Sequence, residues 1–301
     1  MYKVITSQFG GVTLPGRMIT PSGMTWKSEQ ISCRVIPEEI EVPTEVHQLS
    51  ERILAIKKPK ENARTYHLRS ANVSQESLAL EVGKSWYRYN LLHAAFEDRL
   101  REEHPEVFEV LLHHVRPEDL FNLKALGGPL SSGVGITTVV VLAEGLTVMV
   151  HRSKGVSVNA DMDHPALAEG VNPEAGVTGE IDLPKVAIRS GLEELGISTR
   201  QEDLVFLGLC ADGRYWWPGL IARVEVSLTW NELRYRSESA RDRWERSNIR
   251  FISYTPKGIA QELAFAMEPG RGVTGFGSMA LLEAGIADFG REEMEAAFRS
   301  F

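Results

Sequence analysis

The sequence predicts an α/β or α+β fold with a mixed sheet, and three observations support this. The second half alternates β-branched runs of strand length with one amphipathic helical segment and a glycine-rich loop. No apolar run approaches the roughly 18 residues that a membrane-spanning helix needs. Apolar residues make up 43% of the chain and charged residues 25%, as in ordinary globular proteins.

The 301 residues are predicted to form two units. Gly127, Gly128 and Pro129 strongly disfavour helix and strand, and after them the sequence changes to β-branched runs of strand length. Before them, residues 85–114 are predicted to be helical, with a second helix after the break at Pro105, and we interpret their apolar stripe as packing surface. We therefore expect an N-terminal α+β extension over residues 1–130 and a second unit over residues 131–301.

The second unit is expected to open with a hairpin and to continue through a loop into a helix. Strands are predicted at residues 137–143 and 146–151, joined at Glu144-Gly145, with a short strand at 156–158 and a loop over 159–181. The helix is predicted over 183–195. Its expected signals are Asp182 as N-cap, Pro184 in the first turn and Gly196 at the end. Later strands are expected at 204–209, 220–226 and 250–254, and later helices at 258–266 and 278–287.

The net charge and the cysteine content limit the classes of function that the sequence allows. The net charge is −8, which disfavours binding to polymeric nucleic acid but allows a nucleotide whose phosphates are bridged by a metal. Cys33 and Cys210 are too few for a disulfide framework or a zinc site. Because no secretory signal is visible either, the expected location is cytoplasmic.

One face of the predicted helix carries the residues of greatest chemical interest. At about 100° per residue, Arg189, Ser190, Glu193 and Glu194 share a face, and the apolar residues share another. Adjacent glutamates near a helix C-terminus are unfavourable, because they repel each other and the negative end of the helix dipole. A divalent cation would relieve both problems. The alternative is a solvated charged face without a ligand.

The stretch 176–197 resembles the signature of the Nudix hydrolase family. That signature is G, five residues, E, seven residues, then R-E-U-x-E-E-x-G-U, where U is a bulky aliphatic residue. The residues that match its second half in register are Arg189, Glu193, Glu194, Gly196 and Ile197. The resemblance covers about residues 133–266, and it implies a Nudix-type α/β/α sandwich with a mixed sheet.

The stretch also departs from the signature. Ser190 replaces a glutamate that in the family is commonly a metal ligand and in some members the general base, and Gly191 replaces the aliphatic residue. Upstream, eight residues separate Glu180 from Arg189 and six separate Asp182 from it, where the signature has seven. We interpret Glu180 as the upstream acidic partner and Asp182 as a helix cap.

The resemblance implies hydrolysis of a diphosphate linkage in a nucleoside diphosphate derivative, with Mg²⁺ or Mn²⁺ as cofactor. Its expected metal ligands are Glu193, Glu194 and Glu180, and Arg189 would orient a glutamate. Since Ser190 ligates weakly, another carboxylate would have to serve. The candidates are Glu245 and Glu238 in the string SESARDRWE, whose alternative interpretation is an exposed charged helix, and more weakly Glu169.

Two segments could contact the substrate. Tyr215 and Trp216, with Trp217 beside them, could stack on a nucleobase or could equally cover the core. Arg152, flanked by His151 and Lys154, could meet phosphate or simply be the charged end of a strand.

Two functions from different classes remain open from the sequence. The first is a metal-dependent hydrolase, which the Glu193-Glu194 pair favours. The second is a catalytically impaired Nudix-like nucleotide-binding or regulatory module, which Ser190 favours. The N-terminal 130 residues could shape specificity, mediate formation of a homodimer or contact another protein.

Overall fold

The computed structural model describes residues 4–39, 41–57, 63–92, 102–114, 120–124, 126, 133–156, 158–172, 179–268 and 272–301. Its architecture is α+β, and its largest element is a nine-stranded mixed sheet of strand order β10-β9-β8-β13-β12-β3. Off this path, β11 pairs with β8, β14 with β9 and β4 with β12. Strands β8 and β13 run parallel, whereas β12 and β14 pair antiparallel with their neighbours. The strands are β3 (Gly16–Met18), β4 (Trp26–Lys27), β8 (Gly135–Leu142), β9 (Leu146–Arg152), β10 (Asp163–Pro165), β11 (Leu167–Gly170), β12 (Leu204–Asp212), β13 (Trp217–Val226) and β14 (Arg246–Ser253).

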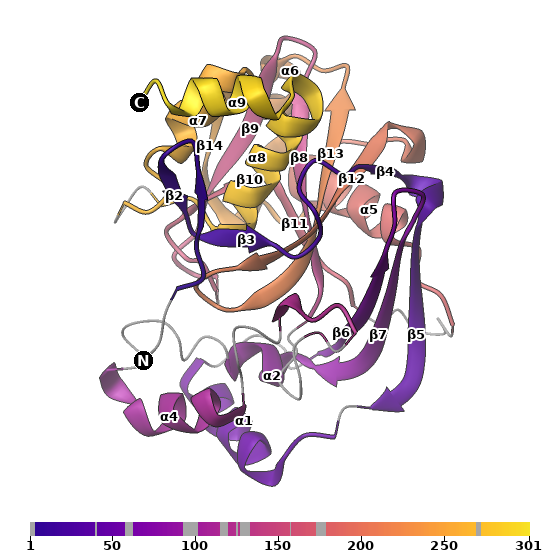
Figure 1. The fold of residues 1–301 in the computed structure, drawn as a ribbon, viewed down its shortest axis with the longest axis vertical. Coiled ribbons are helices and arrows are strands. Elements are labelled where there is room, and N and C mark those ends of the chain that lie inside the picture. Colours follow the sequence, from indigo (N-terminus) through magenta and orange to yellow (C-terminus); the bar gives the residue numbers. More distant parts are fainter. Residues whose placement is uncertain are drawn as a thin grey trace.

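Among its described residues, the N-terminal part carries a three-stranded sheet and the helices α1, α2 and α4. In this sheet β5 and β7 are parallel and β6 is antiparallel to β7. Figure 1 shows α1, α2 and α4 gathered at one end of the molecule, next to this sheet. The elements are the hairpin β1 (Ser7–Phe9) and β2 (Val12–Leu14), the strands β5 (Ile31–Glu39), β6 (Arg64–Val73) and β7 (Leu78–Trp86), and the helices α1 (Thr44–Lys57), α2 (Tyr87–Leu92) and α4 (Pro105–His114).

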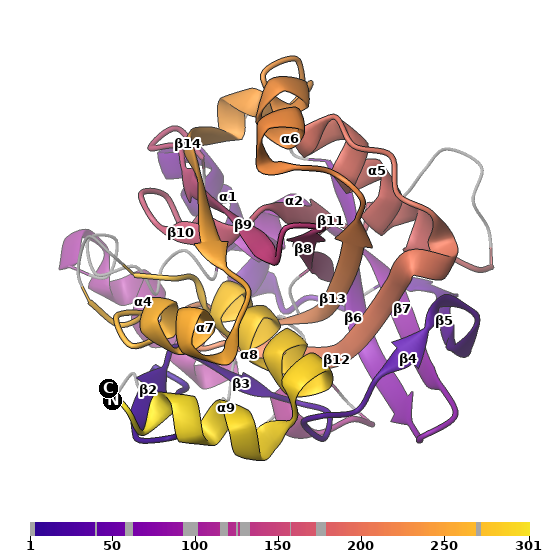
Figure 2. The same cartoon turned by 90° about the horizontal axis from the view of Figure 1, so that it is seen from above.

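Helices cover both faces of the large sheet. Viewed from above, α5 lies on one side of strands β8, β13 and β12, and α8 lies on the other with α7 and α9 beside it (Figure 2). The helices are α5 (Leu183–Leu195), α6 (Trp230–Ser237), α7 (Pro256–Leu263), α8 (Gly275–Phe289) and α9 (Arg291–Phe298). No helix in the part of the chain that the structure describes is long and apolar enough to cross a membrane.

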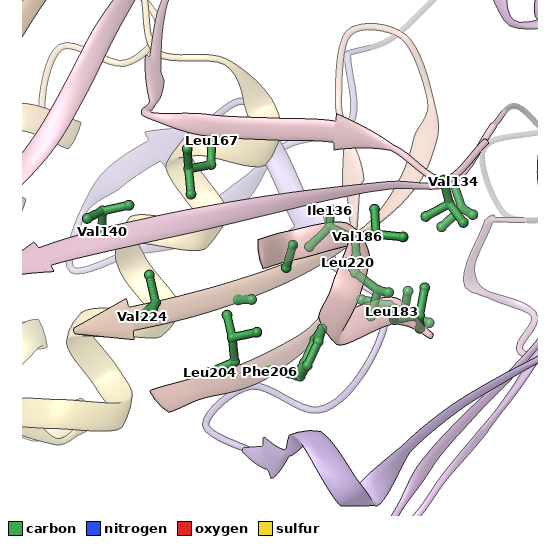
Figure 3. Close-up of a cluster of buried hydrophobic side chains, with 14 of the residues drawn as sticks. Val134, Ile136, Val140, Leu167, Leu183, Val186, Leu204, Phe206, Leu220 and Val224 are labelled. Atoms are coloured by element: carbon green, nitrogen blue, oxygen red, sulfur yellow. The ribbon is translucent and has the colours of Figure 1, made fainter. Parts of the chain in front are cut away.

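The strand alternation divides the core between these two faces. Val148 and Val150 of β9 pack in the cluster under α5, and Met149 packs in the cluster under α8. Figure 3 shows the first of these clusters, where Leu183 and Val186 of α5 meet side chains of the large sheet. Burial of this apolar face fixes α5 on the sheet and leaves its opposite face for polar residues.

Several predicted elements are confirmed, and three are corrected. The hairpin of β8 and β9, the helix over Leu183–Leu195 and the helix after Pro105 are present. The predicted helix from residue 85 begins only at Tyr87, because the preceding residues finish strand β7 in register with β6. The predicted loop 159–181 contains β10 and β11, which are too short to show periodicity. Around the predicted strand 156–158 the chain turns instead, with Val156 N–H donating to the Ser153 carbonyl.

Not all of the N-terminal strands belong to a sheet of their own. Strands β3 and β4 pair with β12 and so extend the large sheet of the second half. The expected unit boundary near residue 130 falls in 127–132, outside the described residues.

Replacing Gly196 with alanine is expected to destabilise the protein by about 2–3 kcal/mol. Gly196 closes α5 at φ 67°, and an added Cβ would lie 2.8 Å from the Arg236 carbonyl oxygen. Gly145 has nearly the same φ of 68° but nothing within 4 Å of an added Cβ, so Gly145→Ala should cost only about 1 kcal/mol. Urea unfolding of both variants tests this expectation, and equal losses would show that the contact with Arg236 is unimportant.

Candidate active site

Helix α5 provides the frame of the site, and its two ends are fixed by local interactions. The Asp182 carboxylate accepts a hydrogen bond from the Lys185 N–H at 3.1 Å, as expected for an N-cap. At the other end, the N–H of Gly196 donates to the carbonyls of Gly191 and Leu192. The last two turns of the helix therefore hold Arg189, Glu193 and Glu194 in defined positions.

Glu194 is held by two donors on the same oxygen. Its Oε1 accepts from Ser190 Oγ at 2.7 Å and from the N–H of Ala168 in β11 at 2.9 Å. Burial raises the pKa of Glu194 to about 8. The charges of Glu169 and Glu245 contribute to this rise, while the two hydrogen bonds oppose it.

Glu193 is engaged by the segment that follows α6. Its Oε1 lies 2.6 Å from Nη1 of Arg241, and its carbonyl accepts the Asp242 N–H at 2.9 Å. The Glu193 side chain is 20% exposed, whereas that of Arg241 is 73% exposed. The main-chain bond fixes this segment against the C-terminal turn of α5, and the ion pair lies at its outer edge.

Glu169 enters from β11 on the same side of the sheet. Its neighbour Leu167, two residues earlier, packs in the core under α5, so strand alternation turns Glu169 to that side as well. Its carboxylate lies 3.5 Å from Nη2 of Arg189. Burial raises the pKa of Glu169 to about 7. Arg189 counteracts the rise, and the charges of nearby acidic residues, Glu193 and Glu245 among them, reinforce it.

Glu245 and Asp242 complete the group of carboxylates. They lie in the turn and short 3₁₀ helix between α6 and β14, and their charges act on Glu169. The N–H of Ser153, just after β9, donates to the Glu245 carbonyl at 2.8 Å and ties this segment to the sheet. We call Glu169, Glu193, Glu194, Asp242 and Glu245 the acidic cluster.

Hydrogen bonds and ion pairs within the protein already hold the side chains of Glu169, Glu193 and Glu194. Among the described residues, no group of three or more histidine, cysteine, aspartate or glutamate side chains is arranged to hold a metal ion. Arg246 is likewise engaged by the protein itself, because it donates to the main-chain carbonyls of Glu194 and Ser237 rather than to a carboxylate. A ligand at this site would therefore have to compete with existing hydrogen bonds and ion pairs.

The structure brings together five of the residues chosen from sequence: Arg189, Glu193, Glu194, Glu245 and the weaker candidate Glu169. Glu180 lies elsewhere, because it precedes α5 and forms a backbone bridge with Arg34 of β5. At 1.5 Å per residue, the rise of α5 from Leu183 to Glu193 alone is roughly 15 Å, and Glu180 lies beyond its N-terminus. Glu238, at the C-terminal end of α6, pairs with Arg243 at 2.8 Å and does not contact the cluster.

The two aromatic candidates lie in the interior. Tyr215 is 1% exposed and Trp216 is 2% exposed, which agrees with the core-packing alternative. Tyr215 stacks on Trp217 with ring centroids 5.3 Å apart, and Trp216 packs in the core of the N-terminal helices. The structure does not place either ring beside the acidic cluster.

The basic candidates at the end of β9 lie on two different faces of the large sheet. Arg152 is paired in register with Arg246 of β14, which puts it at the edge of the acidic cluster. His151 points to the opposite face, where its ring nitrogens contact Asp163 at 2.8 Å and Asp161 at 3.2 Å. Lys154 lies 3.8 Å from the same Asp161, so local acids already balance His151 and Lys154.

A concave surface lies on that opposite face, between β14 and α7. It encloses about 490 Å³ and is lined by Asp163, Arg250, Glu262 and Phe265, among others. The charged groups within it pair with one another, since Arg250 contacts both Asp163, at 2.6 Å, and Glu262. The acidic cluster is the better candidate for chemistry, because it gathers more carboxylates and burial raises the pKa values of two of them.

Sequence reasoning did not identify Arg241 or Asp242 as members of this site. Both lie in the same charged string as Glu245, and the strict alternation of sign through Arg241, Asp242 and Arg243 was the available signal. Alternating charges of this kind are equally typical of a solvated surface, so the string alone could not reveal a shared site.

Comparisons with known proteins add little about function. No family model matches the chain, and no curated protein matches it. Among solved structures, the chain is similar to DR0079 from Deinococcus radiodurans, with a TM-score of 0.35 and 13% identity over 51% of this chain and 82% of that one. A likeness at this level carries no argument about fold or activity.

Proposed function

We propose that the acidic cluster is the active site of a metal-dependent hydrolase that cleaves a diphosphate linkage in a nucleoside diphosphate derivative. The observation that carries the proposal is the convergence of Glu169, Glu193, Glu194 and Glu245 from three separate segments. Two of the four belong to the string that resembles the Nudix signature. The other two supply carboxylates where Ser190 cannot.

The acidic cluster offers carboxylate oxygens, the donor type that a hard divalent cation prefers, but the described side chains would have to rearrange to surround one. Mg²⁺ and Mn²⁺ favour carboxylate oxygens, and Mg²⁺ commonly uses one or two carboxylates together with substrate phosphate. Burial, reinforced by repulsion from neighbouring carboxylates, raises the pKa values of Glu169 and Glu194, so Arg189 and Arg241 do not supply enough positive charge to offset it. A bound cation would supply that charge, and the existing hydrogen bonds would rearrange around it.

Each residue has a distinct role in this proposal. Glu193 and Glu194 would hold the cation, and Glu169, kept near by Arg189, would replace Glu180 as the third ligand. When bound, the cation would neutralise the diphosphate and lower the pKa of the attacking water. Glu245 would take the proton from that water. Ser190 would keep Glu194 oriented through its 2.7 Å hydrogen bond instead of ligating.

A second function is favoured by a specific observation. In the structure Glu193 is neutralised by Arg241, and Ser190 donates to Glu194 rather than offering a carboxylate. These contacts suit a Nudix-like module that binds a nucleotide without cleaving it efficiently. Either function suits the cytoplasm, where Cys33 and Cys210, both buried and unpaired, would stay reduced.

The two functions are separated by measuring metal binding and hydrolysis on the same protein. We expect saturable Mn²⁺ binding by calorimetry in the wild type and its loss in Glu193→Gln/Glu194→Gln. With Mg²⁺ present, a panel of nucleoside diphosphate sugars, dinucleoside polyphosphates and coenzymes should include at least one that is hydrolysed. Glu238→Gln, outside the cluster, is the matched control. Metal binding without hydrolysis would favour the binding module, and the absence of both would exclude the hydrolase.

A further inference from the structure

Strand β14 forms one edge of the large sheet. Within the part of the chain that the structure describes, it pairs with β9 alone. Just beyond the strand, the Tyr254 N–H donates to the Gly145 carbonyl. Since an antiparallel ladder alternates, the N–H and C=O groups of Ile249 and Phe251, and the N–H of Ser253, point away from β9. No described residue forms a hydrogen bond with any of these groups.

The groove between β14 and α7 lies beside this free edge. It encloses about 490 Å³ and is lined by Arg250 and Ile252 of β14 and by Gln261, Glu262 and the nearby Phe265. Helix α7 packs beside the end of β14 (Figure 2), and Phe265 beyond it is 42% exposed. A free strand edge next to a partly apolar groove is the arrangement in which extended peptides bind by strand addition.

The charges in the groove favour a basic side chain. Two carboxylates, those of Asp163 and Glu262, share the guanidinium of Arg250. With the neighbouring His151 uncharged, the groove therefore keeps one negative charge in excess, and the whole chain carries a net charge of −8. A lysine or arginine would lay its aliphatic stem on apolar side chains such as Phe265 and bring its charge to these carboxylates.

We propose that an extended peptide segment with a lysine or arginine docks along β14, pairs with its free main-chain groups and inserts the basic side chain into the groove. Side chains of an added strand alternate between faces, so the residues on either side of the basic one would cover Phe251 and Trp230. These two rings lie 5.9 Å apart, and Trp230 is 36% exposed. The inference is independent of the function proposed above, because the groove and the acidic cluster lie on opposite faces of the large sheet.

Fluorescence anisotropy at pH 8 tests the proposal with a labelled probe, acetyl-Thr-Val-Lys-Val-Thr-Val-amide. We expect saturable binding to the full chain, and binding about tenfold weaker when glutamate replaces the lysine of the probe. A probe methylated on its main-chain nitrogens cannot donate to β14 and should not bind. Absence of binding by the lysine probe, or equal binding of the lysine and glutamate probes, would overturn the proposal.

Matched variants separate the strand edge from the groove. Ser253→Pro removes one outward N–H at a position where an edge strand tolerates proline, so it should weaken binding about fivefold. Ser253→Ala keeps the N–H and should bind as the wild type does. Gln261 is exposed, so Gln261→Lys should weaken the lysine probe about two- to fivefold and Gln261→Glu should tighten it as much, whether or not the proline variant folds. Unchanged affinity in both Gln261 variants would exclude the groove.

Amide hydrogen exchange gives a direct readout of strand addition. The bound probe should slow exchange at the Ile249 and Phe251 N–H groups, whereas the Arg250 N–H, which faces β9, should be slow with and without it. Unchanged exchange at Ile249 and Phe251 would show that the probe does not bind as a strand. Slow exchange at both in the free protein, with the mass of a dimer by sedimentation, would instead assign the edge to a second copy and overturn the proposal.

Discussion

The metal-free protein is expected to lose at least about 2 kcal/mol of stability between pH 5 and pH 8 through Glu169 and Glu194 alone. Burial raises the pKa of Glu169 to about 7 and that of Glu194 to about 8, from an ordinary value of 4.5. In this range the folded protein holds more protons than the unfolded chain. The stabilisation is therefore complete below about pH 4.5 and is lost as the pH rises through the two folded-state values.

The measurement is urea unfolding in EDTA at several pH values, for the wild type and for Glu169→Gln/Glu194→Gln. Other titrating groups are common to both proteins, so the difference between their free energies of unfolding isolates the two glutamates. The variant should be the more stable protein at pH 8, and the two should converge towards pH 5. Parallel curves would show that neither carboxyl is destabilised by its surroundings.

The same electrostatics connect this prediction with the proposed function. A divalent cation binds carboxylates rather than carboxylic acids, so its binding should release protons at neutral pH. Adding Mg²⁺ at pH 8 should restore stability to the wild type and not to the double glutamine variant. Stability thus reports on the site even before a substrate is known.

Half of the site could be predicted from sequence because its signals are local. Asp182, Pro184 and Gly196 delimit a helix within one short window, and the positions of Glu193 and Glu194 on it follow from the helical repeat. The N-cap bond and the left-handed Gly196 that the structure contains are the ones these residue types favour.

The remaining residues of the site could not be predicted as firmly, because their positions depend on how distant strands pair. Glu169 comes from a four-residue strand, and Glu245 comes from a turn about 50 residues beyond α5. Neither segment has a periodic pattern, so sequence could name these residues only as candidates. Glu180 lies nearer in sequence to Glu193 but is kept away by the length of the helix.

Asp212→Ala is expected to cost about 3 kcal/mol or more, the largest loss predicted for a single residue here. Asp212 ends β12 with its side chain almost completely buried, at 1% exposure. Its Oδ1 accepts the N–H groups of Arg214 and Tyr215, both at 2.9 Å, and its Oδ2 accepts the Gly275 N–H at 3.1 Å. Alanine would remove the acceptor of all three N–H groups, two of which lie in buried surroundings.

This carboxylate also joins parts of the chain that sequence could not connect. Its bond to the Gly275 N–H fixes the first turn of α8 to the turn that follows β12. The same turn holds Trp216 at a φ of 56°, which is rare for a large side chain and keeps its ring in the core. Loss of the carboxylate should therefore loosen both the turn and the helix.

Asp212→Asn provides the matched comparison for this residue. An asparagine oxygen can still accept from Arg214 and Tyr215, but its amide group would face the Gly275 N–H, so one bond is lost and two remain. We expect an intermediate loss of about 1–2 kcal/mol in urea unfolding at neutral pH. If Asp212→Ala were no less stable than Asp212→Asn, the two bonds within the turn would contribute nothing. The burial of Trp216 would then have to be explained by packing alone.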